Sequence, residues 1–126
     1  MRVLIFGTFD RLHPGHLFVL AEAGKRGALA IIVARDVTVQ RHKNRLPVHT
    51  EDERRTAVSR AAPSARVLLG DKDDYLRPVR ENVPDLILLG YDQQLPHGVD
   101  LEDLPCPVER LPAFHPELYK SSLCPK

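Results

Sequence analysis

The sequence predicts an α/β protein, with a doubly wound parallel sheet of about five strands in a single domain. Short apolar runs alternate with segments of helical periodicity, which is typical of repeated strand–helix units. Small and polar residues follow the apolar runs, as in the segments 7–10 and 90–92. Since the carboxyl ends of parallel strands share one edge of a sheet, we expect a single site at that edge.

The N-terminal part predicts a strand–helix–strand unit. Arg2–Phe6 is a short apolar run that ends at a glycine, which is typical of a buried strand. Gly15–Arg26 has apolar residues at helical spacing, and Gly27 behind it is a common helix stop. Leu29–Ala34 is a second apolar run. Two strands joined in this way run parallel, with a right-handed crossover.

The middle of the chain predicts a basic loop followed by a capped helix. Arg35–His49 is polar and rich in cations, and we expect a loop over its whole length. Thr50 and Glu53 have the spacing of a capping box, which places a helix from Thr50 to about Ala62.

The remaining elements are expected to be short. Eleven prolines, many of them late in the chain, predict that the last third is rich in loops. The expected elements are a strand, a helix, a strand and a final strand over Val67–Leu69, Tyr75–Asn82, Asp85–Leu89 and Val108–Leu111.

Composition limits the classes of protein that the chain can belong to. Its 126 residues predict one domain, residues 1–126, and its net charge of +1 does not favour a nucleic-acid surface. No apolar run approaches the roughly 20 residues of a membrane span, and no secretory signal is recognisable at the N-terminus. With only Cys106 and Cys124 as cysteines, we expect reduced thiols and a cytoplasmic location, although a disulfide between them stays open.

Two histidines, His13 and His16, lie where the first strand gives way to the first helix. At this spacing they can share a face and direct ring N–H groups at the anion that the free backbone N–H groups of the helix would bind. Such donors stabilise the charge that develops on the α-phosphate and the departing pyrophosphate during nucleotidyl transfer. Gly15 would let the backbone approach the phosphates closely.

Two alternatives stay open for this pair. His-x-x-His suits two zinc ligands, but a structural zinc needs four, and no Cys-x-x-Cys or nearby acidic residue supplies the others. We therefore assign no metal ligand to the chain. In the second alternative the histidines only cap and pack the helix.

The segment Gly7-Thr8-Phe9-Asp10, followed by His13, Gly15 and His16, resembles the signature of the cytidylyltransferase-like nucleotidyltransferases. The resemblance extends over the whole chain, more weakly beyond the first 40 residues. It implies a Rossmann-like fold, a nucleoside triphosphate substrate, a divalent cation such as Mg²⁺ bound with it, and release of pyrophosphate. It also implies a homodimer.

Later motifs are similar to those of one branch, the archaeal-type FAD synthases. They are Ala34–Asp36, Gly90–Gln93 (Gly-Tyr-Asp-Gln) and Glu117–Ser122. Members of this branch transfer AMP from ATP to FMN, giving FAD and pyrophosphate. A cytidylyltransferase acting on glycerol 3-phosphate or another polyol or sugar phosphate stays open as an alternative. So does a non-catalytic nucleotide-binding module, although such a module has no need of both histidines.

The resemblance assigns roles to individual residues. The expected catalytic residues are His13, His16 and Lys43, the last on the family's mobile loop. The expected nucleotide-binding residues are Thr8, Phe9, Asp10, His13, His16, Gly90, Tyr91, Asp92, Tyr119, Ser121 and Ser122. The expected substrate-binding residues are Asp36, Arg41 and Arg54. Asp10 is expected to fix its loop or orient a histidine. Since no side chain is an obvious nucleophile, we expect direct in-line attack by the acceptor phosphate.

Overall fold

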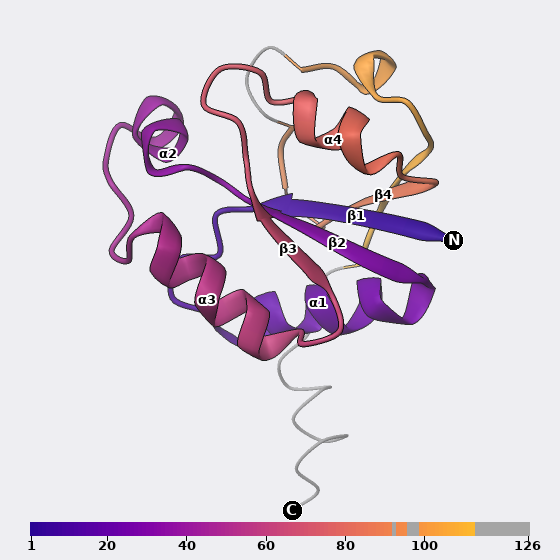
Figure 1. Cartoon of the computed structure of the whole chain (residues 1–126), viewed down its shortest axis with the longest axis horizontal. Helices are drawn as coiled ribbons and strands as arrows, with labels where there is room; N and C mark the ends of the chain where they lie inside the picture. Colours follow the sequence, from indigo (N-terminus) through magenta and orange to yellow (C-terminus); the bar gives the residue numbers. More distant parts are fainter. Residues whose placement is uncertain (92, 96–98, 113–126) are drawn as a thin grey trace, which may run out of the picture.

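The structure, a computed structural model, describes residues 1–91, 93–95 and 99–112. Its strands are β1 (Arg2–Gly7), β2 (Ala28–Val33), β3 (Arg66–Leu69), β4 (Leu86–Leu89) and β5 (Val108–Arg110). They form one parallel sheet in the order β3-β2-β1-β4-β5 (Figure 1). The order reverses between β1 and β4, as in a doubly wound sheet, so the predicted fold class is confirmed.

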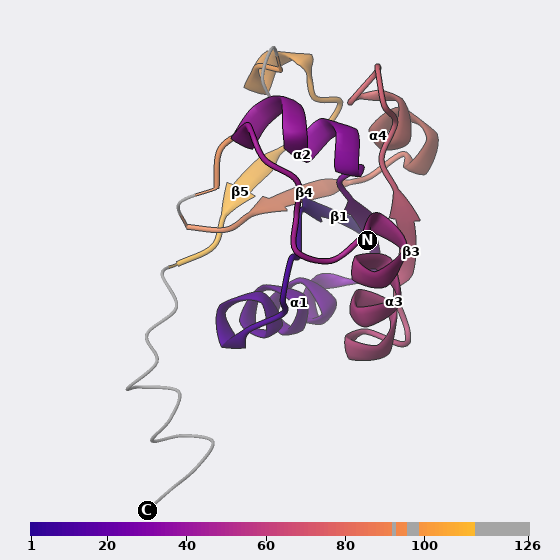
Figure 2. The same cartoon turned by 90° about the vertical axis from the view of Figure 1, so that its left-hand side faces the viewer.

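Helices cover both faces of this sheet. They are α1 (Pro14–Arg26), α2 (Asp36–Lys43), α3 (Glu51–Ala61) and α4 (Arg77–Asn82), with a 3₁₀ turn, η1 (Leu101–Asp103). Helices α1 and α3 lie on one face, and α2 and α4 lie on the other (Figures 1 and 2). No helix among the described residues has the length and apolar character needed to cross a membrane.

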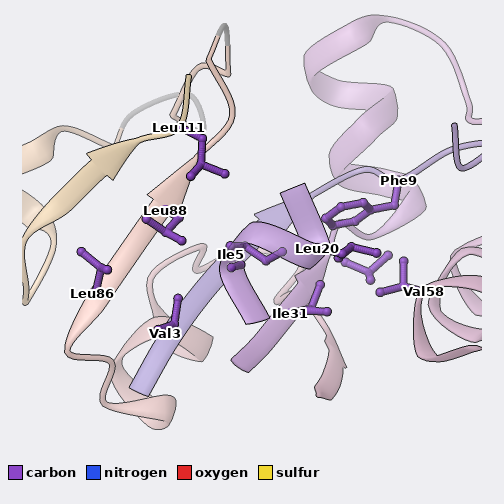
Figure 3. Close-up of a cluster of buried hydrophobic side chains, with 11 residues drawn as sticks. Val3, Ile5, Phe9, Leu20, Ile31, Val58, Leu86, Leu88 and Leu111 are labelled. Carbon is purple, nitrogen blue, oxygen red and sulfur yellow. The ribbon is translucent and has the colours of Figure 1, made fainter. Parts of the chain in front are cut away.

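Strands β1, β2 and β4 have side chains buried on both faces of the sheet, which explains their unbroken apolar runs. Val3 and Ile5 of β1 join the cluster under α1 and α3, whereas Leu4 between them joins a second cluster on the α4 face. Leu20 of α1 and Val58 of α3 complete the larger cluster (Figure 3). Side chains therefore alternate between two cores along one strand.

The prediction that Arg35–His49 is a loop throughout is wrong, because α2 occupies its first half. Of the residues in α2 only Val39 is buried, so the helix shows almost no apolar periodicity. Arg35 at its N-cap makes no side-chain cap bond; instead the Glu51 carboxylate of α3 accepts from the Asp36 N–H at 2.8 Å. Because this cap comes from a separate helix, the local sequence around Asp36 does not predict the start of α2.

The other predicted elements are present, with small shifts at their ends. The capping box of α3 is confirmed: Glu53 N–H donates to Thr50 Oγ1 at 3.2 Å, and Thr50 N–H donates to Glu53 Oε1 at 2.9 Å. Helix α4 begins later than expected because the Asp71 carboxylate accepts from the N–H groups of Asp73 and Asp74, which form a turn there.

Two glycines of the first strand–helix–strand unit give a matched test of the fold. A Cβ on Gly27 would lie 2.2 Å from the Met1 carbonyl oxygen, which accepts from Ala28 N–H at 2.9 Å. Gly27→Ala should therefore lower the free energy of unfolding by more than about 2 kcal/mol, since backbone has to move. Gly24→Ala meets nothing within 4 Å and should raise it by about 0.5–1 kcal/mol. Urea unfolding measures both, and a Gly27→Ala protein as stable as the wild type would contradict this packing.

Candidate active site

A large cavity lies at the carboxyl edge of the sheet. It is lined by residues that follow the strands, including Thr8 after β1, His16 at the start of α1, Gly70 after β3 and Gly90 after β4. Its volume is about 1380 Å³, which exceeds the roughly 300–1,000 Å³ of a pocket for one small molecule. The cavity therefore has room for two substrates side by side.

The loop after β1 makes a strained turn just before His13 and His16. Phe9 and Arg11 have φ angles of 54° and 55°, in the left-handed region that non-glycine residues rarely adopt. The Phe9 ring is 5% exposed and meets the His16 ring edge-on, at 5.6 Å between centroids. A Cβ on Gly7 would lie 3.1 Å from the Phe9 ring, which is a tight contact, so the ring packs closely over this glycine.

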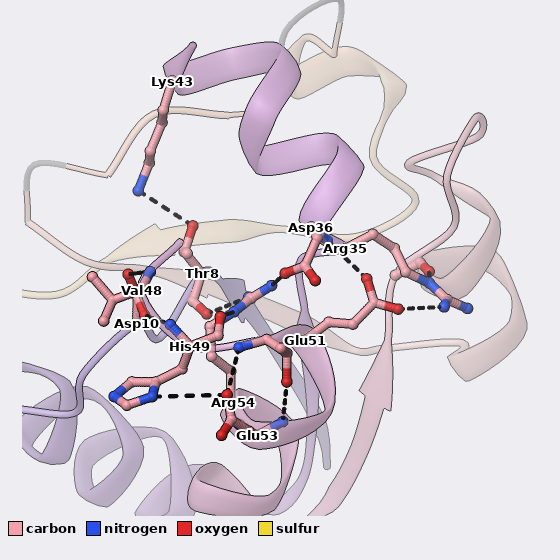
Figure 4. A network of polar contacts seen from close by, with 12 residues as sticks. Thr8, Asp10, Arg35, Asp36, Lys43, Val48, His49, Glu51, Glu53 and Arg54 are labelled. Atoms are coloured by element: carbon pink, nitrogen blue, oxygen red, sulfur yellow. Dashed lines mark hydrogen bonds and ion pairs between the residues drawn. The ribbon is translucent and has the colours of Figure 1, made fainter. Parts of the chain in front are cut away.

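Asp10 fixes this turn to the segment that precedes α3. Its carboxylate accepts from the N–H groups of Val48 and His49 at 2.8 and 3.0 Å (Figure 4). Burial opposes ionisation of the Asp10 carboxyl, but these two backbone bonds outweigh it and lower its pKa below the ordinary value. The contacts of Asp10 match the loop-fixing role expected from the sequence.

His13 and His16 cap the start of α1 with one ring nitrogen each. Gly15 N–H donates to His13 Nδ1 at 3.1 Å, and His13 N–H donates to His16 Nδ1 at 3.3 Å. Because Nδ1 accepts in both rings, the neutral form of each carries its proton on Nε2. The rings stack at 3.8 Å between centroids, and both line the cavity. Capping thus leaves two Nε2–H donors, so the capping alternative and the phosphate-binding role are compatible.

His16 is neutral at physiological pH. Burial, together with the nearby charges of His13 and Lys43, lowers the pKa of His16 from 6.5 to about 4, and Asp10 offsets only part of this effect. An uncharged imidazole donates a hydrogen bond from Nε2 without acting as a strong acid. The site therefore presents an oriented dipole rather than a fixed cation at this position.

Lys43 and Arg41, two cations of α2, have different partners. Lys43 at the end of α2 donates to Thr8 Oγ1 at 3.3 Å and lines the cavity (Figure 4). Arg41 donates to the Lys72 carbonyl oxygen and to the Tyr75 hydroxyl, both at 3.0 Å, and lies outside the lining. Of the two, only Lys43 is brought to the loop that carries the histidines.

Arg54, expected to bind substrate, has its guanidinium enclosed by the protein. The residue is 1% exposed and is not part of the cavity wall. It donates to the carbonyl oxygens of Thr8 and His49 at 2.8 and 3.1 Å, and to Asp36 Oδ1 at 2.6 Å (Figure 4). In this structure Arg54 and Asp36 therefore bind each other and the loops, not the cavity.

The bonds of Arg54 to Thr8, His49 and Asp36 form a clamp between these segments. The first turn of α3 extends this clamp to the residues that follow β2 and β3. Glu51 Oε2 accepts from Arg35 NH1 at 3.0 Å, and Arg35 Nε donates to the Gly70 carbonyl oxygen at 2.7 Å. Together with Arg54, these bonds join the residues that follow β1, β2 and β3. The relative positions of three cavity loops are thus set by one helix start.

The loop after β4 contains both expected and unexpected site residues. Gly90 and Tyr91 line the cavity as expected, and Asp92, Tyr119, Ser121 and Ser122 lie outside the described residues. Gln93 also lines the cavity, and Arg110 of β5 binds the same loop. Sequence reasoning did not assign a role to either, although Gln93 is the last residue of the Gly-Tyr-Asp-Gln motif.

Metal-ligating side chains do not gather in the part of the chain that the structure describes. It contains no group of three or more His, Cys, Asp or Glu side chains that could hold a metal ion. Asp10 and His16 are neighbours in the site, but the Asp10 carboxylate and Nδ1 of His16 accept from backbone N–H groups.

Comparison with known proteins gives a consistent result. The sequence model of the family described as "Cytidylyltransferase-like" matches residues 4–105. The chain is similar to the crystal structure of the lipopolysaccharide core biosynthesis protein from Thermoplasma volcanium, with a TM-score of 0.78 and 31% identity. That match covers 91% of this chain and 98% of the other.

Three proteins with the curated name "FAD synthase" illustrate the sequence similarity. The one from Aciduliprofundum boonei is 48% identical over 75% of this chain and 63% of its own length. The one from Methanospirillum hungatei is 49% identical over 74% and 59%. The one from Methanoculleus marisnigri is 41% identical over 97% and 85%. The chain thus matches about three fifths of the length of the first two relatives.

Removal of the Arg54 guanidinium tests the clamp. Arg54→Met keeps a side chain of similar length but leaves the Asp36 carboxylate and two carbonyl oxygens without their donor, so we expect a loss of about 3 kcal/mol in the free energy of unfolding. The neighbouring Arg55 is a matched control because its ion pair with Asp52, at 3.6 Å, is exposed. Arg55→Met should change stability by less than about 0.5 kcal/mol. Equal effects of the two substitutions in urea unfolding would contradict the clamp.

The lowered pKa of His16 predicts how stability depends on pH. The unfolded chain takes up a proton at His16 near pH 6.5, whereas the folded protein does so only near pH 4. The contribution of His16 to the free energy of unfolding is therefore fully present above pH 6.5 and is lost as the pH falls from 6.5 to 4. Denaturant titrations across this window should give a steeper loss for the wild type than for His16→Asn. Superimposable pH profiles would show that His16 titrates normally.

Proposed function

This chain belongs to the cytidylyltransferase-like family, and we propose that it is an FMN adenylyltransferase, which converts ATP and FMN into FAD and pyrophosphate. The observation that carries the proposal is the pair of Nε2–H donors of His13 and His16, beside Lys43, at the wall of a cavity large enough for two substrates. Relatives that are 41–49% identical and named FAD synthase support the choice of ATP and FMN.

The chemistry follows from the donors that the site offers. An oxygen of the FMN phosphate, already anionic, attacks the α-phosphorus of ATP, while the bond from that phosphorus to the bridging oxygen of the β-phosphate breaks. Pyrophosphate leaves with the electron pair, and no proton has to be removed from the attacking oxygen. The Nε2–H groups of His13 and His16 donate to the phosphate oxygens on which charge develops, and the Lys43 ammonium neutralises the leaving group.

The neutral state of His16 suits this role. Because the pKa of His16 is about 4, the ring is almost entirely neutral at neutral pH and keeps its proton on Nε2. Rigid hold by the Nδ1 bonds means that the donors need no reorganisation when charge develops. The expected contribution is electrostatic, without a covalent enzyme intermediate.

A divalent cation such as Mg²⁺ fits the site best as part of the triphosphate complex. The described residues offer no cluster of side chains for a cation of its own. The cation, when bound, neutralises charge on the phosphate oxygens. A cytoplasmic location and a homodimer remain predictions from the sequence.

A pyrophosphate-release assay tests the function. ATP and CTP are each combined with FMN, glycerol 3-phosphate or phosphopantetheine, and we expect turnover with ATP and FMN, with FAD as the product. His16→Ala should lower kcat about 100-fold or more, as loss of an oriented donor does in other enzymes. Lys25→Gln on the exposed surface of α1, where Lys25 pairs with Glu22, is the control and should keep full activity.

Two results would contradict the proposal in different ways. Turnover only with CTP and a polyol phosphate would assign the chain to another branch of the family. Binding of ATP without turnover of any acceptor, unchanged in His16→Ala, would indicate a non-catalytic nucleotide-binding module.

A further inference from the structure

The register pairs between β1 and β4 end before the two strands reach the cavity. Their register pairs are Val3 with Leu86 and Leu4 with Ile87, although β1 continues to Gly7 and β4 to Leu89. The strand order reverses here, and a crevice between the two carboxyl ends is where ligands bind in open α/β sheets. Something has to hold the two backbones at a defined separation beyond the paired residues.

The Gln93 carboxamide makes that connection. Its Nε2 donates to the Phe6 carbonyl oxygen of β1 at 2.6 Å, and its Oε1 accepts from the Gly90 N–H, just beyond β4, at 2.9 Å. A carboxamide has one donor side and one acceptor side, as a peptide group has, so it can link two backbones across a gap. At this level the link between β1 and the end of β4 runs through a side chain.

Arg110 of β5 holds the same turn from its other side. Its NH1 donates to the carbonyl oxygens of Gly90, Tyr91 and Gln93 at 2.8, 3.2 and 2.7 Å. Gln93 N–H also donates to the Gly90 carbonyl oxygen at 3.1 Å, which closes the turn and directs the side chain back toward β1. The guanidinium is a rigid group, so three carbonyl oxygens on one nitrogen leave the turn little freedom.

We propose that Gln93 is a positioning residue, which sets the width of the crevice between β1 and β4 and thereby the fit of the nucleotide. One wall of the crevice carries Gly90, Tyr91 and Gln93, and the other leads from Phe6 directly into Gly7 and Thr8. These six residues line the cavity. Both polar atoms of the Gln93 carboxamide are engaged with backbone, so the residue acts through the two walls. The inference rests on the proposed function for the identity of the nucleotide.

Three substitutions separate the parts of this connection. Gln93→Met keeps the length but makes neither bond. Gln93→Asn keeps the carboxamide but is one methylene too short to reach both partners. Gln93→Glu keeps an acceptor for Gly90 N–H but sets a carboxylate against the Phe6 carbonyl oxygen. Glu109→Gln is the matched control on β5, because Glu109 pairs with Arg26 on the surface and points away from the turn's anchor, Arg110.

We expect each Gln93 variant to raise the KM for ATP about tenfold, as the loss of one or two hydrogen bonds predicts. The KM for FMN and kcat should change less than about threefold, and Glu109→Gln should match the wild type. Calorimetric titration with a non-hydrolysable ATP analogue, without FMN, should show the same tenfold weakening. Thermal unfolding is measured in parallel to show that each variant is folded. If Gln93→Met does not fold, the KM and the affinity of Gln93→Asn for the ATP analogue test the inference.

The outcomes distinguish this inference from the proposed function. If the wild type makes FAD and the Gln93 variants bind the ATP analogue with the same affinity as the wild type, the inference is wrong and the function stands. A fall in kcat and thermal stability with an unchanged KM for ATP also overturns it, since that is the mark of a purely structural role. If the wild type makes no FAD but the variants still bind the analogue more weakly, the inference stands and the function is wrong.

Discussion

The buried guanidinium of Arg54 is the contact on which the geometry of the site depends. It binds the carbonyl oxygen of Thr8 after β1, the carbonyl oxygen of His49 before α3 and the carboxylate of Asp36 at the start of α2. A buried cation that lost these partners would be strongly unfavourable, so the loops and the helix start that carries Arg54 are obliged to keep their relative positions. The strained turn at Phe9 can persist because this clamp and Asp10 hold both of its sides.

From this fixed turn follows the state of the two histidines. Their Nδ1 atoms are used to cap α1, and their Nε2–H groups remain for a ligand, so one pair of rings serves both the fold and the chemistry. Burial and neighbouring charges keep His16 neutral, which preserves its donor at physiological pH. On the opposite wall of the crevice, Gln93 joins the end of β4 to β1. The cavity is thus enclosed by parts whose spacing is set by hydrogen bonds to backbone.

Continuous apolar runs were sufficient to predict β1, β2 and β4, because these strands are buried on both faces of the sheet. Apolar periodicity failed for α2, whose only buried residue is Val39 and whose cap comes from Glu51 of another helix. The motif around His13 and His16 located the site, since those residues follow one another in the chain. Arg54 and Gln93 act through partners 46 and 87 residues away, and no local pattern can specify such contacts.

The central claim is that backbone N–H groups occupy Nδ1 of both His13 and His16, so that Nε2–H of each ring faces the cavity and His16 is neutral. Long-range ¹H–¹⁵N correlation spectra of the imidazole rings at neutral pH test it most directly, because the two ring nitrogens give different shifts in each tautomer and in the imidazolium. The account predicts the Nε2–H tautomer for both His13 and His16, with His16 remaining neutral down to about pH 4. A proton on Nδ1 of either ring, or a charged His16 at pH 6, would contradict it.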